Sequence, residues 1–239
     1  ALADAVSAGL ASAGVHVLRG GVLPTPALAC ASEGRHGVMI TASHNPPADN
    51  GLKLFADGVE YDRAAERRVE TFVDERSSVA WPDWTDSEAV SVLDHYRESV
   101  VEYAERSGSS LDGLRIAVDA GNGTAALATP DVLRTLGGDV VVLDGNVDGR
   151  FPARSSKPTP ESLASFRSFV RRDDAALGIA HDGDADRIAV VAPDGEIVHE
   201  DTILAVLAEH YTRRSTAADP VVVTTPNASA RIDEHVETH

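Results

Sequence analysis

Short apolar runs alternate with longer amphipathic stretches along this chain, and the alternation limits the possible folds more than any other feature of the sequence. Apolar runs bounded by turn residues indicate strands, and strands that alternate with helices favour an α/β layer structure. The pattern is clearest in the second half of the chain. There we expect strands at 114–118, 139–143, 175–180 and 188–191, a helix that ends near Leu136, and helices at 160–171 and 201–211.

The first half repeats the alternation less regularly. We expect helices at 4–13 and 26–31, strands at 15–18 and 37–41, an irregular polar segment at 69–86, and a connecting helix at 86–106. A further strand is expected at 220–223 and a helix at 227–239. These patterns predict three units: a first domain at 1–86, a linker helix with a second domain at 87–212, and the start of a third domain at 213–239.

The charge balance excludes several classes of partner. The 239 residues include 21 Lys plus Arg and 38 Asp plus Glu, which gives a formal net charge of -17. Such a charge repels nucleic-acid phosphates and anionic membranes, so we expect neither as a partner. Lysine occurs only at Lys53 and Lys157. An acidic surface with so little lysine predicts adaptation to high salt, because salt screens the repulsion within the chain.

Nothing in the sequence resembles a membrane or export signal. No apolar run approaches the length that spans a bilayer, and the first ten residues lack the basic and apolar regions of a signal peptide. We therefore expect a cytoplasmic protein. The sequence does not indicate an oligomeric state.

The segment HDGDADR at 181–187 follows an apolar run and places Asp182, Asp184 and Asp186 at alternate positions. Three carboxylates this close repel one another, and together they offer hard oxygen ligands for one divalent cation. An EF-hand would need Gly at the sixth and Glu at the twelfth position of the loop, and this chain has neither. Two other interpretations stay open: a solvated acidic turn, and a phosphatase-type loop in which Asp182 is a nucleophile that becomes phosphorylated.

A second loop, TASHNPPADNGLK at 41–53, contains Ser43 just after a strand-like run. It lies outside the G-x-S-x-G motif, and a histidine next to it in sequence does not make a triad, so acyl transfer is disfavoured. A turn or capping role is the ordinary interpretation of such a serine. A phosphate on Ser43 would, however, supply oxygen ligands for a cation at the aspartates. The guanidinium of Arg187, beside the acidic loop, is well suited to a phosphate.

The two loops together resemble the α-D-phosphohexomutase superfamily, which includes phosphoglucomutase, phosphomannomutase and phosphoglucosamine mutase. The matching segments are TASHNPPADNGLK at 41–53 and DGDADR at 182–187, with lesser similarity in VLPTPAL at 22–28 and DGRFPARSSKPTPESL at 148–163. The resemblance implies tandem, similar three-layer α/β/α domains with mixed sheets. It also implies that the chain contains roughly the first two of four domains, without the early strands of the first.

The resemblance also implies a role for each site residue. Ser43 would be the phosphorylated serine, and Arg187 would contact the transferring phosphate. Lys53 or His44 would assist proton transfer, and a lysine near a cation can have its pKa lowered toward the range useful for acid–base chemistry. The implied ligands of one Mg²⁺ ion are a phosphoserine oxygen of Ser43 and the carboxylates of Asp182, Asp184 and Asp186.

In the implied reaction, phosphoserine transfers its phosphoryl group to a hexose 1- or 6-phosphate, and the bound 1,6-bisphosphate returns its other phosphate to Ser43. An activator such as glucose 1,6-bisphosphate would phosphorylate Ser43. Which hexose phosphate is the substrate depends on loops of the later domains. Two alternatives remain: a Mg²⁺-dependent phosphatase or phosphotransferase with Asp182 as nucleophile, and a non-catalytic module that binds sugar phosphates.

Overall fold

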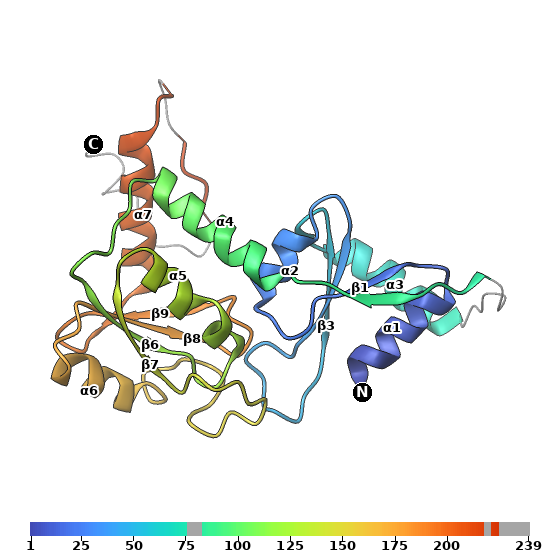
Figure 1. Cartoon of the computed structure of the whole chain (residues 1–239), viewed down its shortest axis with the longest axis horizontal. Helices are drawn as coiled ribbons and strands as arrows, with labels where there is room; N and C mark the ends of the chain where they lie inside the picture. Colours follow the sequence, from blue (N-terminus) through green and yellow to red (C-terminus); the bar gives the residue numbers. More distant parts are fainter. Residues whose placement is uncertain (76–82, 218–220, 225–239) are drawn as a thin grey trace.

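The computed structural model describes residues 1–75, 83–217 and 221–224, which form two α/β parts side by side (Figure 1). Helix α4 (Leu93–Arg106) runs along both parts and contacts α2 (Thr25–Ala31) of the first and α5 (Thr129–Thr135) of the second. Among the described residues, no helix combines the length and the apolar character needed to cross a membrane.

The first part carries two small sheets. Strands β1 and β5 pair in parallel, and β2, β3 and β4 form an antiparallel sheet in that order. Residues 41–51 therefore form the loop of the hairpin between β2 and β3. Besides α2, the elements are α1 (Leu2–Ser12), β1 (Val17–Arg19), β2 (His36–Ile40), β3 (Leu52–Ala56), β4 (Val59–Glu60), α3 (Arg63–Glu75) and β5 (Ser87–Ala89).

The second part has one mixed sheet with the strand order β10-β9-β8-β6-β7. Strands β7, β6 and β8 are parallel, and β9 is antiparallel to both β8 and β10. Residues 182–187 are the tip of the β8–β9 hairpin. Besides α5, the elements are β6 (Arg115–Asp119), the 3₁₀ helix η2 (Thr124–Leu127), β7 (Asp139–Leu143), α6 (Ala164–Arg172), β8 (Leu177–His181), β9 (Ile188–Val191), β10 (Ile197–Val198) and α7 (Glu200–Arg214).

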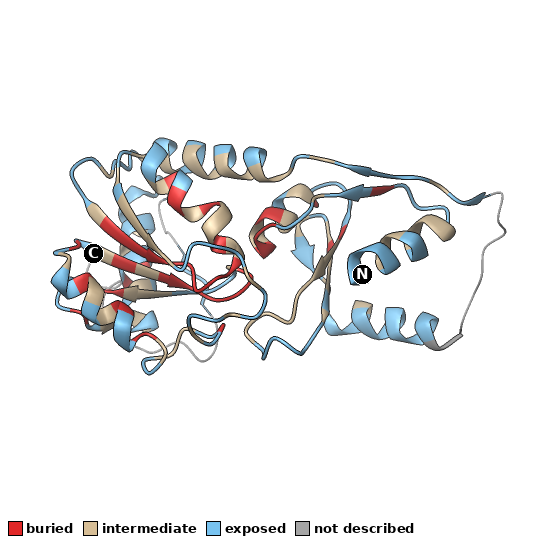
Figure 2. Cartoon of the chain, turned by 60° about the horizontal axis from the view of Figure 1, so that its bottom comes forward, coloured by how far each residue is buried: buried red, intermediate tan, exposed pale blue. Residues whose placement is uncertain are grey.

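The main hydrophobic core lies in the second part, where most of the buried residues are found (Figure 2). Phe166 and Val170 are one helical turn apart on α6, and both pack onto the sheet. Gly178 on β8 allows this close approach, since a Cβ there would lie 2.6 Å from a methyl carbon of Val170. The β8–β9 hairpin that carries the acidic loop therefore stands on a tightly packed support.

The predicted mixed α/β class is confirmed, and the strands at 139–143 and 188–191 are found with the predicted bounds. The prediction of an irregular segment at 69–86 was wrong for residues 69–75, because helix α3 continues to Glu75. Residues 76–82 lie outside the described part of the chain. The helix predicted to begin at residue 86 begins at Leu93, because 87–89 pairs with β1 instead.

Besides β5, the strands β3, β4 and β10 were not predicted. The strand predicted at 220–223 does not form over 221–223, and residue 220 and the predicted helix at 227–239 lie outside the described residues.

Candidate active site

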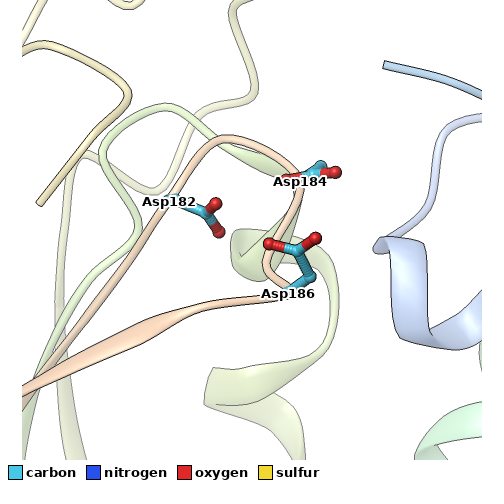
Figure 3. A group of neighbouring side chains, drawn as sticks. All are labelled: Asp182, Asp184 and Asp186. Atoms are coloured by element: carbon cyan, nitrogen blue, oxygen red, sulfur yellow. The ribbon is translucent and has the colours of Figure 1, made fainter. Parts of the chain in front are cut away.

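The three aspartates of the acidic loop converge. One oxygen from each of Asp182, Asp184 and Asp186 lies within 4.8 Å of the others, and Figure 3 shows the three side chains on a single loop. Asp182 and Asp184 are buried, at 1% and 4% exposed, whereas Asp186 lies at the surface. The loop is tied to itself because the Arg187 N–H donates to Asp182 Oδ1 at 3.2 Å.

Two carboxylate oxygens in this cluster are buried without a hydrogen-bond partner among the described residues: Asp182 Oδ2 and Asp184 Oδ1. A buried carboxylate oxygen without a partner is costly, and it needs a donor or a cation. Hard divalent cations such as Mg²⁺ prefer oxygen ligands of this kind. The donor set and its two unpaired oxygens therefore fit a divalent cation.

Ser43 lies in the β2–β3 loop with a left-handed backbone, φ 55°. Its N–H donates to Thr41 Oγ1 at 2.8 Å, and Thr41 Oγ1 in turn donates to Asp184 Oδ2 at 3.1 Å. The loop also touches the acidic loop directly, since a Cβ on Gly183 would lie 3.1 Å from the Ser43 carbonyl oxygen. The structure thus brings together two loops that are about 140 residues apart in sequence.

Lys53 on β3 points into the acidic cluster. Its Nζ lies 2.5 Å from Asp186 Oδ2 and 3.3 Å from Asp184 Oδ2, and its side chain is 19% exposed. Arg187 is more exposed, and its Nε lies 3.7 Å from Asp186 Oδ1. His44 adjoins the serine, with Nδ1 3.2 Å from Ser43 Oγ.

The surroundings move the pKa values of these groups in different directions. Burial, and then the charges of Arg187 and Lys157, lower the pKa of His44. Burial also acts to lower the pKa of Lys53, but its hydrogen bonds and charge contacts with Asp186 and Asp184 outweigh that effect, so the pKa is raised. The lowered lysine pKa expected from the sequence depends on a cation beside Lys53 and stays a prediction; with only the carboxylates beside it, the pKa is raised.

Asp182 is the most strongly perturbed carboxyl of the loop. Burial, and then the charges of Asp184 and Asp186, raise the pKa of Asp182 to about 7. Three acidic groups that face one buried space cannot all ionise at low cost without a cation.

The segment 148–163, noted in the sequence only for its resemblance, supports both loops. Arg154 Nη2 donates to the His181 carbonyl at 2.7 Å, directly before Asp182, and Ser156 Oγ donates to the Asn45 carbonyl at 3.2 Å. The loops that carry the predicted site residues are thus both anchored to this one segment.

Comparison with known proteins agrees with this arrangement. Residues 1–80 match the phosphoglucomutase/phosphomannomutase alpha/beta/alpha domain I, and residues 94–195 match domain II of the same family. The chain belongs to the phosphoglucomutase/phosphomannomutase family. The two matched ranges follow each other along the chain in the order of the two parts of the fold.

The chain spans about half the length of the phosphoglucomutase/phosphomannomutase relatives and solved structures that it matches. A probable phosphoglucosamine mutase of Methanopyrus kandleri is 40% identical over 99% of this chain and 52% of its own, and a phosphopentomutase of Thermococcus kodakarensis is 37% identical over the same shares. A family protein from Burkholderia thailandensis superposes with a TM-score of 0.77 at 34% identity, over 89% of this chain and 48% of its own. A putative phosphomannomutase from Thermus thermophilus gives 0.78 at 27% identity, over 90% and 51%.

Sequence analysis of this phosphoglucomutase/phosphomannomutase chain missed some residues that shape the site. Thr25, Thr41 and Arg154 make buried or partly buried contacts with the acidic loop, yet none was predicted to belong to it. Thr25 and Arg154 lie in the segments VLPTPAL and DGRFPARSSKPTPESL, whose family resemblance was noted without a role. That resemblance was the available signal.

Proposed function

We propose that the protein containing this chain is a phosphohexomutase that interconverts hexose 1-phosphate and hexose 6-phosphate through a phosphoserine at Ser43 and a bound 1,6-bisphosphate. The single observation that carries the proposal is the contact between the Ser43 loop and the acidic loop, through Gly183 and through the Thr41 hydroxyl. A phosphoserine there would lie close to carboxylates that need a cation.

We propose that the cation is Mg²⁺, held by Asp182, Asp184 and Asp186 with an oxygen of phosphorylated Ser43. The unpaired buried oxygens of Asp182 and Asp184 support this ligand set. When bound, Mg²⁺ would neutralise charge on the phosphoryl oxygens during transfer.

The other residues would manage charge and protons. Arg187, exposed at the edge of the acidic loop, would contact the transferring phosphate through its planar guanidinium. As Ser43 Oγ attacks the bisphosphate, its proton would pass to His44, whose lowered pKa keeps the imidazole neutral at pH 7. In the reverse step the proton would return to Ser43 Oγ as the phosphoryl group leaves. Despite burial, hydrogen bonds with Asp186 and Asp184 raise the pKa of Lys53 in the metal-free protein. As an ammonium, Lys53 would either stabilise negative charge on the sugar oxygen or donate a proton to it.

The aspartyl-nucleophile alternative has less support. Asp182 is only 1% exposed, and its Oδ1 already accepts the Arg187 N–H. The partly exposed Ser43 is more accessible to a sugar phosphate. The non-catalytic alternative predicts that Ser43 never carries phosphate.

The deciding experiment is intact-mass measurement and peptide mapping of the whole protein, with and without glucose 1,6-bisphosphate and Mg²⁺. Acid-stable phosphate on Ser43, with its transfer dependent on Mg²⁺, is expected. Phosphate on Asp182 would favour the phosphatase, and phosphate on neither residue would favour a binding module. Ser43→Ala is the matched control, because it leaves the acidic loop intact.

The names of the relatives indicate which substrates to test in an activity assay. Relatives are named for glucosamine and pentose phosphates, so glucose, mannose and glucosamine phosphates should be assayed beside a pentose phosphate. We also propose domains at about 1–86, 87–212 and 213–239, in keeping with the matched ranges 1–80 and 94–195. Because β5 (Ser87–Ala89) pairs with β1 of the first part and α7 ends at Arg214, the two boundaries would fall a few residues later, after Ala89 and after Arg214.

A further inference from the structure

Thr25 holds Asp184 at two points. The Thr25 hydroxyl donates to Asp184 Oδ2 at 2.8 Å, and the Thr25 N–H donates to the Asp184 carbonyl oxygen at 2.9 Å. Thr25 is 5% exposed and Asp184 is 4% exposed, so both hydrogen bonds are sheltered from water. The two residues come from different parts of the fold, 159 positions apart.

The local sequence makes Thr25 available for this contact. Thr25 is the first residue of α2, where an N–H has no partner within the helix, and Pro24 and Pro26 flank it. A proline in the first turn fits the helix backbone and brings no further N–H. The Thr25 N–H and hydroxyl are therefore directed away from α2 and toward the acidic loop.

The contact distinguishes the two oxygens of Asp184. Oδ2 accepts hydrogen bonds from Thr25 Oγ1, from Thr41 Oγ1 at 3.1 Å and from Lys53 Nζ at 3.3 Å. Oδ1 is buried and has no hydrogen-bond partner among the described residues. A carboxylate held on one side by three donors cannot rotate freely. Its other oxygen, Oδ1, is left without a donor, on a residue that forms one cluster with Asp182 and Asp186.

We propose that Thr25 is a positioning residue for the cation: its hydroxyl fixes the carboxylate of Asp184 so that Oδ1 is free to bind the metal. This inference rests on the proposed metal site. Partners that orient a ligating carboxylate typically contribute about 10- to 100-fold to metal affinity. Because Thr41 and Lys53 also donate to Asp184 Oδ2, we expect the loss of Thr25 to weaken metal affinity by a factor near the lower end of that range.

The test measures how tightly the metal-free protein binds Mn²⁺, a spectroscopic substitute for Mg²⁺. Electron paramagnetic resonance detects the Mn²⁺ that remains free at each point of the titration. Thr25→Val keeps the shape of the side chain and its backbone N–H but removes the hydroxyl, and about tenfold weaker binding is expected. Thr25→Ser restores the hydroxyl and should restore the affinity. A purely structural role would lower the melting temperature of Thr25→Val without changing the affinity of the folded protein, and that result would overturn the inference.

Two further variants separate the inference from the function it rests on. Asp184→Asn should abolish Mn²⁺ binding; if it does and Thr25→Val binds normally, only the role of Thr25 fails. If Asp184→Asn binds Mn²⁺ as well as the unaltered protein, the metal site itself is wrong, and the inference falls with it. Should Thr25→Val not fold, Thr25→Ala replaces it, and an unchanged affinity in that variant overturns the inference equally.

Discussion

Arg154 and Asp119 form a buried ion pair beneath the acidic loop, with Nε 2.8 Å from Oδ2 and side chains that are 6% and 4% exposed. Arg154 also donates to the carbonyl of His181. Removal of one partner from a buried pair leaves an uncompensated charge, which costs about 3–5 kcal/mol. Arg154→Met should therefore lower the free energy of unfolding by about that amount, measured by urea titration.

Arg115, on the same strand as Asp119, forms exposed ion pairs that serve as the control. Arg115 contacts Asp173 and Asp139 and is 40% exposed, so Arg115→Met should lower the free energy of unfolding far less than Arg154→Met does, because water screens exposed charges. Equal losses for Arg154→Met and Arg115→Met would show that burial does not set the strength of these pairs. The double change Arg154→Met with Asp119→Asn should recover part of the loss, because it removes both charges of the buried pair.

Gly123 supports the acidic loop from below, and a side chain there should displace it. A Cβ at Gly123 would lie 2.7 Å from the Gly183 carbonyl oxygen and 2.9 Å from that of Asp182. Both are backbone atoms, so Gly123→Ala must shift the loop, at a cost of about 1–3 kcal/mol. Weaker Mn²⁺ binding should accompany the lower melting temperature.

Gly149→Ala is the matched control, since nothing lies within 4 Å of a Cβ at that position. It should leave Mn²⁺ binding unchanged and should not lower the melting temperature. If Gly123→Ala behaves in the same way, the acidic loop is more adaptable than its contacts indicate.

The main elements and the candidate site residues could be predicted from sequence because their signals are local. The strand at 139–143 is a continuous apolar run, and Asp182, Asp184 and Asp186 lie within one short loop. Ser43 was singled out by its loop and by the family resemblance, and its role stays a prediction.

Features that depend on distant pairing could not be predicted. Strand β5 is only three polar or small residues, Ser87–Ala89, and it is a strand because it pairs with β1 about 70 residues earlier. The contact from Thr25 to Asp184 likewise crosses 159 positions. The direction of the Lys53 pKa also depends on which carboxylates lie beside it, and sequence spacing does not show this.

Metal binding should depend on pH through Asp182. Burial and the neighbouring carboxylates raise its pKa to about 7, so in the metal-free protein below that pH the carboxyl keeps its proton. A cation needs the carboxylate and must displace this proton. The affinity for Mn²⁺ should therefore rise with pH up to about 7 and then level off, by up to about tenfold per pH unit.

Calorimetry in two buffers of different ionisation enthalpy measures the same effect as protons released on binding. At a pH about one unit below the pKa, close to one proton per bound Mn²⁺ is expected, and far fewer well above it. Asp182→Asn should remove this release and weaken binding. Release that does not change with pH would contradict the raised pKa.

The Lys53 ammonium contacts two of the carboxylates that would bind the cation. They belong to Asp186 and Asp184, and the contact is largely buried. Like charges that share one set of carboxylates repel each other. Lys53→Met should therefore tighten Mn²⁺ binding by about tenfold while it slows phosphoryl transfer to or from Ser43. Lys53→Arg keeps the charge and should bind Mn²⁺ like the unaltered protein, and Lys157→Met, which removes the exposed second lysine, should change the affinity little. Weaker binding by Lys53→Met would instead mean that Lys53 chiefly orients the carboxylates, so that its hydrogen bonds outweigh its repulsion of the cation.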